Sequence, residues 1–444
     1  MTYGRFFRPE IETAAPEVIR RLQEEKLRRQ LQYVYANSPF YQRKFAAAGL
    51  KPEDIRTIED LRYLPFTEKD ELRQSQVAHP PLGDYAAVPM KRVVRIVASS
   101  GTTGRPSYIG VTEADRRVWL ETVSRVCWSQ GVRPDSVAVV GFRLGMFVGG
   151  LPLQQAIEHI GATCIPIGTG ESYRLVEAIR EFGADTLFVT PSYAIYLAEY
   201  VRKQFGLEPR SLGLRRIHVG GEPGGGIPHV RHRLEEEWGA MVTEGIGNAD
   251  VLPIYAAECE EQKGMHFLAP DFLILEVIDP ETGTPLSLDQ PEVRGELVFT
   301  HVEREGMPLV RFRTRDHVVV WTGSCPCGRT GVRIRCVGRT DDMLIVRGVN
   351  VWPSAVRDVI MSQRPATTGE IQILLTEPGP QVTPPLRVQV EHGEGVPDLE
   401  QLKEHLERLL RERLMVQAAV ELVPPGTLPR YEMKAQLIRR LYKA

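Results

Sequence analysis

The segment Ser99-Ser100-Gly101-Thr102-Thr103-Gly104 carries four hydroxyl groups beside two glycines and directly follows an apolar, β-branched run at residues 93–98. Glycine lets the backbone approach a ligand closely, and hydroxyls together with backbone N–H groups can surround the oxygens of a polyphosphate. The Gly-Lys-Ser/Thr ending of a Walker A loop is absent, so this is not the loop of a P-loop ATPase. A flexible Ser/Gly turn is the alternative interpretation. The arrangement of hydroxyls favours a phosphate-binding loop.

Three cysteines and one histidine form a second candidate site. The tight turn Cys325-Pro326-Cys327-Gly328 could present two thiolates to one ion, and Cys259 and His266 could complete a tetrahedral Cys₃His set. Cys-x-Cys is tighter than the usual Cys-x₂-Cys of a zinc knuckle, so four unrelated reduced residues are the alternative. A closed set of four ligands would be structural, because it leaves no position open for a substrate.

Composition excludes several classes of protein. The chain has 444 residues, with 55 Lys and Arg against 57 Asp and Glu, so its formal net charge is −2. This balance argues against a general nucleic-acid binder, and six cysteines are too few for a disulfide scaffold. The N-terminus lacks the apolar segment of a signal peptide, and the most apolar stretch, 137–152, is interrupted by Arg143 and several glycines. We therefore expect a cytoplasmic protein with neither a membrane nor a nucleic-acid partner.

The elements that must position these residues are predicted from periodicity and from breaker residues. A helix is expected over 16–48, with a break at Asn37-Ser38-Pro39, and two more are expected over 112–131 and 173–182. Thr112 and Asp115 form a capping box for the second. Strands are expected at 93–98, 137–141, 186–190 and 216–219. This alternation predicts a mostly parallel sheet covered on both faces.

The predicted pattern of strands and helices changes twice in the second half of the chain. Strands at 272–278, 295–300 and 317–321 with little helix between them predict an antiparallel β subdomain. After Gly338, strands near 371–375 and 386–391 and a helix over 399–414 predict a small domain. The expected fold class is therefore α/β, with a large multi-layered N-terminal domain at 1–338 and a small α+β C-terminal domain at 341–444.

Several segments occur in an order that resembles the signature set of the acyl-adenylate-forming (AMP-binding) enzymes. Besides the Ser/Thr/Gly loop they are Gly220-Gly221-Glu222-Pro223, Arg311-Phe312-Arg313-Thr314-Arg315-Asp316, Gly338-Arg339-Thr340-Asp341-Asp342, and Pro425-Gly426-Thr427-Leu428-Pro429-Arg430 through Lys434. Four more resemble the phenylacetate–CoA ligase and coenzyme F390 synthetase branch: Tyr35-Ala36-Asn37-Ser38-Pro39-Phe40-Tyr41, Phe147-Val148-Gly149-Gly150-Leu151, Thr190-Pro191-Ser192-Tyr193-Ala194 and Arg347-Gly348-Val349-Asn350-Val351. The similarity runs from about residue 30 to residue 440.

The resemblance implies a ligase that uses ATP, Mg²⁺ and coenzyme A. A carboxylate, by default an aryl or similar mostly apolar acid, would attack the α-phosphate of ATP to give an acyl-adenylate and pyrophosphate, and the thiol of coenzyme A would then release AMP. Two alternatives stay open. One is an adenylate-forming enzyme with a different acceptor, which would form an amide, an ester or an F390-type adenylyl product. The other is a non-catalytic, ligand-binding descendant. A homodimer is also left open.

The resemblance also implies roles for individual residues. Lys434 would bridge the substrate carboxylate and the α-phosphate during adenylation, Asp341 would lie at the hinge of a mobile C-terminal domain, and Arg339 would contact the nucleotide. Asp316 would accept hydrogen bonds from the ribose hydroxyls. The cofactor-binding set would be completed by Ser99, Ser100, Gly101, Thr102, Thr103 and Gly104 at the phosphates, by Gly221, Glu222 and Pro223 along the adenine, and by Gly348.

The metal sites follow the family pattern less closely. The usual Tyr-Gly-x-Ser/Thr-Glu motif is replaced by Glu244-Gly245-Ile246-Gly247-Asn248-Ala249-Asp250, so the stacking tyrosine is missing. One alignment places Asp250 at the Mg²⁺ position and the other places Asn248 there; we prefer Asp250, because a carboxylate is a hard oxygen ligand. For Cys259, His266, Cys325 and Cys327 the resemblance implies a structural zinc. Arg143 is either a solvated charge at the rim of the acid pocket or a partner for a polar group of the substrate.

Overall fold

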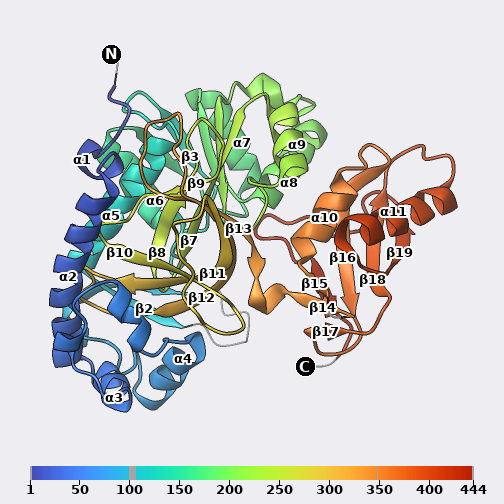
Figure 1. The fold of residues 1–444 in the computed structure, drawn as a ribbon. Helices are drawn as coiled ribbons and strands as arrows, with labels where there is room; N and C mark the ends of the chain where they lie inside the picture. The colour runs from blue at the N-terminus through green and yellow to red at the C-terminus, as the bar shows by residue number, and fades with distance from the viewer. Residues whose placement is uncertain (1–2, 100–106, 348, 443–444) are drawn as a thin grey trace. The chain divides into compact units, whose positions relative to one another are not determined.

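The computed structural model describes residues 3–99, 107–347 and 349–442 (Figure 1). These residues divide into two compact units. The first comprises residues 1–189, 213–221 and 243–336, and the second comprises 190–212, 222–242 and 337–444. The second unit thus joins the C-terminal segment to two earlier stretches of chain. The division into domains at 1–338 and 341–444 remains a prediction.

The large sheet of the described residues has eleven strands, each wholly or mainly in the first unit. Their order is β10-β11-β12-β13-β9-β8-β7-β6-β5-β3-β4. The strands are β3 (Val137–Val140), β4 (Thr163–Pro166), β5 (Thr186–Val189), β6 (Arg216–Gly220), β7 (Met241–Asn248), β8 (Leu252–Ala257), β9 (Met265–Phe267), β10 (Leu273–Ile278), β11 (Glu292–His301), β12 (Phe312–Trp321) and β13 (Arg333–Arg339).

Parallel and antiparallel pairing coexist in this sheet. Strand β3 pairs in parallel with β4 and β5, and β5 pairs in parallel with β6. From β7 onward, the pairs β7–β8, β8–β9, β9–β13, β10–β11 and β11–β12 are antiparallel. Both kinds of pairing were predicted. The structure adds that the antiparallel strands continue the parallel sheet instead of forming a separate layer.

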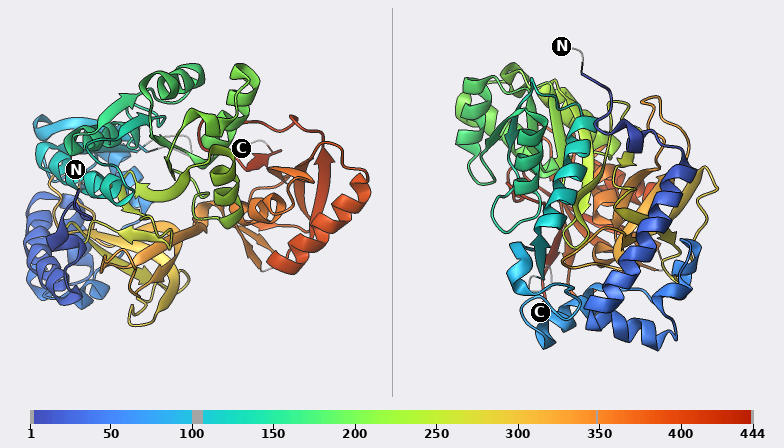
Figure 2. Two further views of the ribbon diagram at one scale, coloured as in Figure 1. Left: turned by 90° about the horizontal axis from the view of Figure 1, so that it is seen from above. Right: turned by 90° about the vertical axis from the view of Figure 1, so that its left-hand side faces the viewer.

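Seven α-helices of the described residues lie in the first unit. They are α1 (Pro9–Glu12), α2 (Pro16–Asn37), α3 (Pro39–Ala47), α4 (Lys69–Ala78), α5 (Glu113–Ser129), α6 (Gly150–Ile160) and α7 (Ser172–Phe182), with 3₁₀ turns η1 (Pro52–Asp54), η2 (Glu59–Tyr63) and η3 (Met90–Arg92). The chain crosses from β3 to β4 through α6 and back to β5 through α7. Because such crossovers are right-handed, their opposite directions place α6 and α7 on opposite faces. The helices α5 and α6 pack side by side (Figure 2).

Local signals set several helix ends, and the sequence predicts among them the start of α5 and the break between α2 and α3. Thr112 and Asp115 form the capping box of α5, with the Asp115 amide donating to Thr112 Oγ1. Gly183 closes α7 in the left-handed conformation, at φ 59°. The predicted helix over 16–48 is divided into α2 and α3 at Ser38, which caps α3. Helix α2 buries Leu27, Leu31 and Val34 in the main core of the first unit.

The strand predicted at 93–98 has a different neighbour from the one expected. It forms β1 (Val93–Ala98), which pairs antiparallel with β2 (Tyr108–Thr112) in a two-stranded sheet of its own. Its sequence is as β-branched as that of a parallel core strand, but four of its six residues are only half-buried and Val94 is exposed. The predicted phosphate loop connects these two strands.

The second unit contains four α-helices among its described residues, namely α8 (Pro191–Tyr200), α9 (Pro228–Trp238), α10 (Pro353–Met361) and α11 (Leu399–Leu414), with the short turns η4 (Val201–Phe205), η5 (Pro209–Leu212) and η6 (Thr340–Asp342). A four-stranded sheet, β19-β18-β16-β20, consists of β16 (Thr367–Leu375), β18 (Leu386–His392), β19 (Ala418–Val423) and β20 (Ile438–Arg440). A three-stranded sheet, β15-β14-β17, consists of β14 (Leu344–Val346), β15 (Val349–Val351) and β17 (Gln381–Val382). Helices α10 and α11 contact each other and cover the larger sheet.

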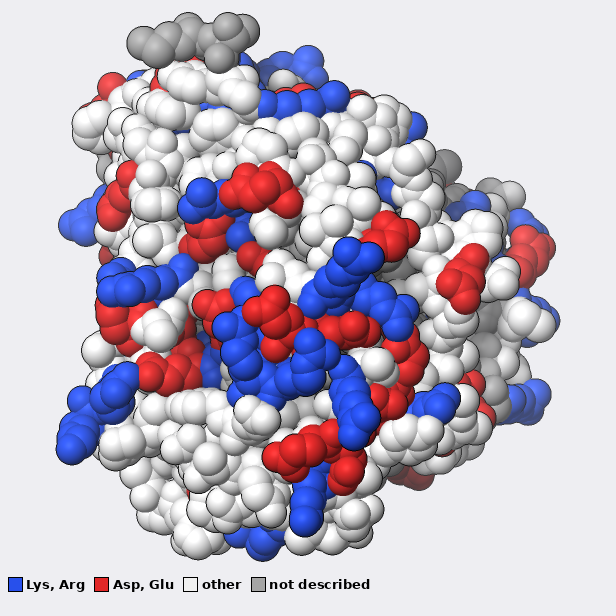
Figure 3. All heavy atoms as spheres, turned by 60° about the vertical axis from the view of Figure 1, so that its left-hand side comes forward, with Lys and Arg blue, Asp and Glu red and all other residues white. Residues whose placement is uncertain are grey.

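The charged surface residues are of both signs. On the face drawn in Figure 3, lysine and arginine alternate with aspartate and glutamate, so neither sign dominates that face. Among the described residues, the helices are all too short or too polar to cross a bilayer.

Candidate active site and candidate metal centre

The two ends of the phosphate loop are fastened to each other. The Ser99 amide donates to the Ser107 carbonyl oxygen at 2.9 Å, and the Ser107 amide donates to Ser99 Oγ at 3.1 Å. Ser99 therefore helps to close the neck of the loop as a continuation of the β1–β2 ladder. The other predicted phosphate ligands, Ser100, Gly101, Thr102, Thr103 and Gly104, lie outside the described residues.

The candidate Mg²⁺ ligand Asp250 follows β7 and is buried, with 8% of its surface exposed. Lys69, the first residue of α4, places its Nζ 2.7 and 2.6 Å from the two carboxylate oxygens of Asp250. Asn248 Oδ1 accepts from the Asp250 amide at 3.0 Å, so the two alternative metal positions are themselves hydrogen-bonded. The ion pair satisfies the buried carboxylate, which would otherwise be costly to bury. No sequence pattern indicates Lys69 as this partner, because 181 positions separate the two residues.

Asp316 lies in β12 and is buried, with 4% exposure. Asp316 is therefore not an exposed loop residue. Arg315 turns to Glu68, with 2.8 Å between Nη2 and Oε2, and Glu68 immediately precedes Lys69. Two adjacent residues at the N-terminus of α4 therefore form these ion pairs. Glu68 pairs with Arg315, the neighbour of Asp316, and Lys69 pairs with Asp250.

The predicted adenine segment follows β6, the strand whose last residue is Gly220. A Cβ at Gly220 would lie 2.7 Å from the Gly245 carbonyl oxygen on β7, so only glycine permits this approach of the two strands. Gly221 has φ 86°, a left-handed conformation that glycine adopts readily. The chain passes from the first unit to the second between Gly221 and Glu222, and Pro223 follows in the second unit.

Lys434 lies in the second unit on the segment between β19 and β20, and its side chain is exposed. The backbone on both sides of it is hydrogen-bonded. Thr190 Oγ1 donates to the Met433 carbonyl oxygen at 3.3 Å, and the Ala435 amide donates to Glu222 Oε2 at 2.6 Å. The structure thus holds the main chain at this lysine while leaving its ammonium group accessible.

The predicted nucleotide contact Arg339 is the last residue of β13, and the predicted hinge residue Asp341 follows it in η6. Arg339 Nη2 is 3.3 Å from Asp341 Oδ2, and the Asp341 side chain is 60% exposed. Such an exposed pair contributes little to stability, so it would be easy to separate. Gly348 lies outside the described residues. Arg143 is exposed.

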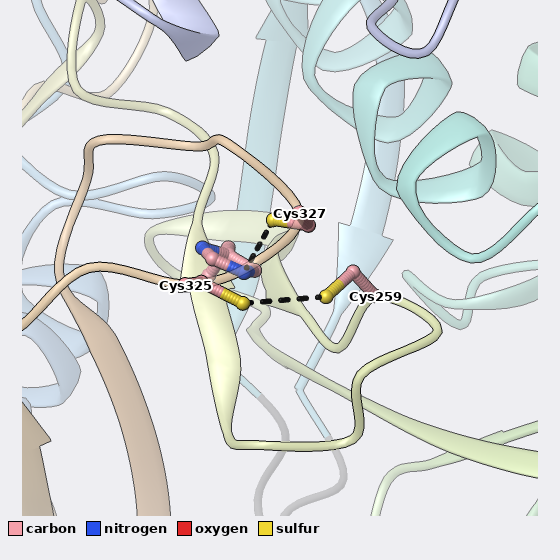
Figure 4. Close-up of side chains that lie close together, drawn as sticks. Cys259, Cys325 and Cys327 are labelled. Atoms are coloured by element: carbon pink, nitrogen blue, oxygen red, sulfur yellow. Dashed lines mark hydrogen bonds between the residues drawn. The ribbon is translucent and has the colours of Figure 1, made fainter.

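The predicted metal ligands Cys259, His266, Cys325 and Cys327 come together in the first unit, and all four are buried. Their ligand atoms lie within 4.8 Å of one another. The Sγ atoms of Cys259 and Cys325 are 3.9 Å apart, and Cys327 Sγ is 3.3 Å from His266 Nε2 (Figure 4). A tetrahedral ion with Zn–S bonds near 2.3 Å requires sulfurs about 3.8 Å apart. This donor set could therefore hold a four-coordinate metal ion.

The three cysteine thiols of this set differ in pKa. Hydrogen bonds with Cys259 and then with His266 hold the pKa of the Cys327 thiol well below its ordinary value, at about 2. The bond to Cys327 and burial raise the pKa of Cys259, and burial raises that of Cys325. Nδ1 of His266 is buried and has no hydrogen-bond partner among the described residues. Nε2 faces Cys327 Sγ, so it is the ring nitrogen available to a metal ion.

Comparison with known proteins gives the context for these geometries. The model of the AMP-binding enzyme family matches residues 14–302, and that of the AMP-binding enzyme C-terminal domain matches residues 348–440. The chain belongs to the AMP-binding enzyme family. It is 39% identical to the phenylacetate-coenzyme A ligase of Thermus thermophilus over 96% of this chain and 97% of that protein.

Solved structures give the same relationship in three dimensions. The 2-hydroxyisobutyryl-CoA ligase, in its postadenylation state with 2-HIB-AMP, is 32% identical and superimposes with a TM-score of 0.92 over 99% of this chain and 93% of that chain. In its thioesterification state with 2-HIB-AMP and CoA, the same ligase is 33% identical and gives a TM-score of 0.73 over 98% of this chain and 92% of that one.

Proposed function

We propose that this chain is an AMP-forming acid–CoA ligase. It activates a carboxylic acid with ATP to an acyl-adenylate and pyrophosphate, then transfers the acyl group to coenzyme A and releases AMP. The observation that carries this proposal is the 39% identity to a phenylacetate-coenzyme A ligase along nearly the whole of both chains. The 2-hydroxyisobutyryl-CoA ligase structures with an acyl-adenylate and with CoA support the two-step course.

The chemistry needs charge neutralised on the phosphates and the reactants held in line. Lys434 supplies an ammonium group that bridges the attacking carboxylate and the α-phosphate. Asp316 accepts from the two ribose hydroxyls, a role suited to a buried group that only accepts. The loop 99–104 holds the β- and γ-phosphates, and the segment Gly221–Pro223 lies along the adenine.

The substrate class is an aryl or similarly apolar acid. The test is a panel of acids assayed for ATP–pyrophosphate exchange and, separately, for AMP release with and without coenzyme A. Phenylacetate, ring-substituted phenylacetates, benzoate and 2-hydroxyisobutyrate form its core. We expect exchange with at least one aryl acid, and AMP release that requires coenzyme A. Exchange followed by AMP release with an amine instead would favour amide synthesis, and failure of exchange across the panel would favour a ligand-binding descendant.

Asp250 is our candidate for contact with Mg²⁺, which would neutralise charge on the leaving pyrophosphate. Its carboxylate suits Mg²⁺, but the pair with Lys69 must loosen for direct coordination. Changing Asp250 to Asn removes the anionic ligand and should raise the Mg²⁺ concentration for half-maximal pyrophosphate exchange by about tenfold or more.

The matched control for this prediction is Lys69→Met, which breaks the same ion pair but leaves the carboxylate in place. We expect it to leave the Mg²⁺ requirement unchanged or to lower it. If both variants shift the Mg²⁺ requirement alike, Asp250 serves only as the partner of Lys69. If Asp250→Asn causes no shift, Asn248 becomes the candidate.

We also propose that Cys259, His266, Cys325 and Cys327 hold a structural Zn²⁺. The separations of the donor atoms and the burial of all four residues support this assignment. When bound, the ion would replace the shared protons, fix three thiolates and one imidazole, and leave no coordination position for a substrate.

A further inference from the structure

Glu222 carries a contact that its place in the adenine segment does not explain. Its carboxylate spans two separate pieces of backbone in the second unit. Oε1 accepts from the Ser192 amide at 2.8 Å, near the start of α8, and Oε2 accepts from the Ala435 amide at 2.6 Å, one residue beyond Lys434. An ionised carboxylate only accepts hydrogen bonds, so it can serve both N–H donors at once.

Residues at the start of α8 also hold the backbone beside Lys434. Thr190 caps α8 by accepting from the Tyr193 amide at 3.1 Å and donates its own hydroxyl to the Met433 carbonyl oxygen. The carbonyl before Lys434 and the amide after it are therefore both held from one place, the first turn of α8 together with Glu222. The Thr190-to-Ala194 motif has no role in the proposed reaction so far. Here it supplies the Thr190 hydroxyl that binds the Met433 carbonyl oxygen and the Ser192 amide that binds Glu222.

A second anchor holds the chain upstream of the lysine. Arg430 pairs with Glu391 at 2.9 and 3.0 Å and with Glu199 of α8 at 3.1 Å. The Glu391 side chain is fully buried, and it also accepts from the Leu428 amide at 2.6 Å. Burial alone would raise the pKa of Glu391, but Arg430 and Leu428 together hold it below its ordinary value. The segment 428–435 is therefore held at both ends by carboxylates of the second unit, and Lys434 projects between them.

We propose that Glu222 is a positioning residue for Lys434, holding the lysine backbone in place for adenylation through the Ala435 amide while Ser192 orients the carboxylate. The inference rests on the proposed role of Lys434. A positioning role for Glu222 and a contact to adenine would affect different steps of the reaction. A residue that positions Lys434 affects the step that uses the lysine, whereas a residue that binds adenine affects every state in which the nucleotide moiety is bound.

The test uses Glu222→Gln in the full chain, with Glu222→Asp as the second variant if the first lowers the thermal unfolding midpoint. Glutamine offers one acceptor oxygen, so one of the two amides would face an NH₂ group. We expect the maximal rate of pyrophosphate exchange to fall about 10- to 100-fold, the size of a lost hydrogen bond to a charged group. The KM for ATP and the rate of thioester formation from synthetic phenylacetyl-adenylate should each change less than about threefold. Phenylacetate is the probe acid unless the panel gives a faster one.

The deciding readout is a double-mutant cycle. If Glu222 acts through the lysine, adding Glu222→Gln to Lys434→Ala should lower the rate of pyrophosphate exchange by less than about a further twofold. Glu236→Gln, an exposed glutamate on α9 in the same unit, is the matched control and should leave all rates unchanged. An equal loss in both backgrounds, or a raised KM for ATP with equally slowed thioester formation, would overturn the proposal. If Lys434→Ala alone leaves exchange intact, the role of Lys434 itself fails, and this outcome is distinct from a failure of Glu222 alone.

Discussion

Lys434→Ala is expected to lower the rate of pyrophosphate exchange by at least about 10²- to 10³-fold while leaving ATP binding within about threefold. The reason is that the ammonium group neutralises charge that develops between the acid and the α-phosphate only during the attack. The measurements are exchange kinetics with the best acid of the panel and equilibrium binding of ATP. Thioester formation from a synthetic acyl-adenylate should be nearly unaffected, since that step does not need the bridge.

Lys403→Ala provides the matched control for this prediction. Lys403 is a lysine of the same unit on α11, where it pairs with Glu400, and its removal should leave both half-reactions unchanged. If Lys434→Ala exchanges pyrophosphate at nearly the rate of the unaltered protein, the assignment of the adenylation lysine is wrong. If it fails in both half-reactions equally, the lysine is instead a general nucleotide contact.

Loss of the metal centre is expected to have the second large effect. Cys325→Ser should reduce zinc from one per chain to well below one and lower the thermal unfolding midpoint by about 10 °C or more, because a closed zinc site contributes binding free energy directly to folding. Metal analysis of protein purified without added zinc, together with thermal unfolding, measures both. Cys164→Ser, at a half-buried thiol outside the cluster, is the control and should change neither.

The location of the damage can also be predicted. Directly after the Cys-x-Cys turn, Arg329 pairs with buried Glu12 at 2.8 Å, and the Thr330 amide donates to the Glu12 carbonyl oxygen at 3.1 Å. The turn therefore anchors the N-terminal segment, and Cys325→Ser should make the region around α1 sensitive to limited proteolysis. Unchanged zinc content, or full stability without zinc, would remove the metal centre.

Local patterns explain why much of the fold could be predicted. The helix expected at 399–414 corresponds to α11, because Leu402, Leu406 and Leu410 repeat at the helical period and form its buried face. The capping box of Thr112 and Asp115 and the closing Gly183 depend only on neighbouring residues. By contrast, β1 pairs with the next strand, β2, instead of with the large sheet. A β-branched run is compatible with either pairing, because β propensity reflects packing against whichever neighbours the fold supplies.

For the candidate sites too, the sequence predicts the residue types but not which residues lie next to each other. The four metal ligands are named by their residue types, but only folding brings Cys259 within 3.9 Å of Cys325, 66 positions away. The carboxylate of Asp250 identifies it in the sequence as a candidate metal ligand, whereas its partner Lys69 is an ordinary lysine at the start of a helix.

What the sequence by itself determined is the family, the identity of the chemical groups and several of the helices and strands, because these depend on residue type, order and short-range periodicity. Only the tertiary structure decided how those groups are paired: Lys69 with Asp250, Glu222 with the backbone beside Lys434, and the N-terminal segment with the cysteine turn. The physical reason is that a hydrogen bond or ion pair depends on distances of about 3 Å, and folding sets such distances between residues far apart in the chain.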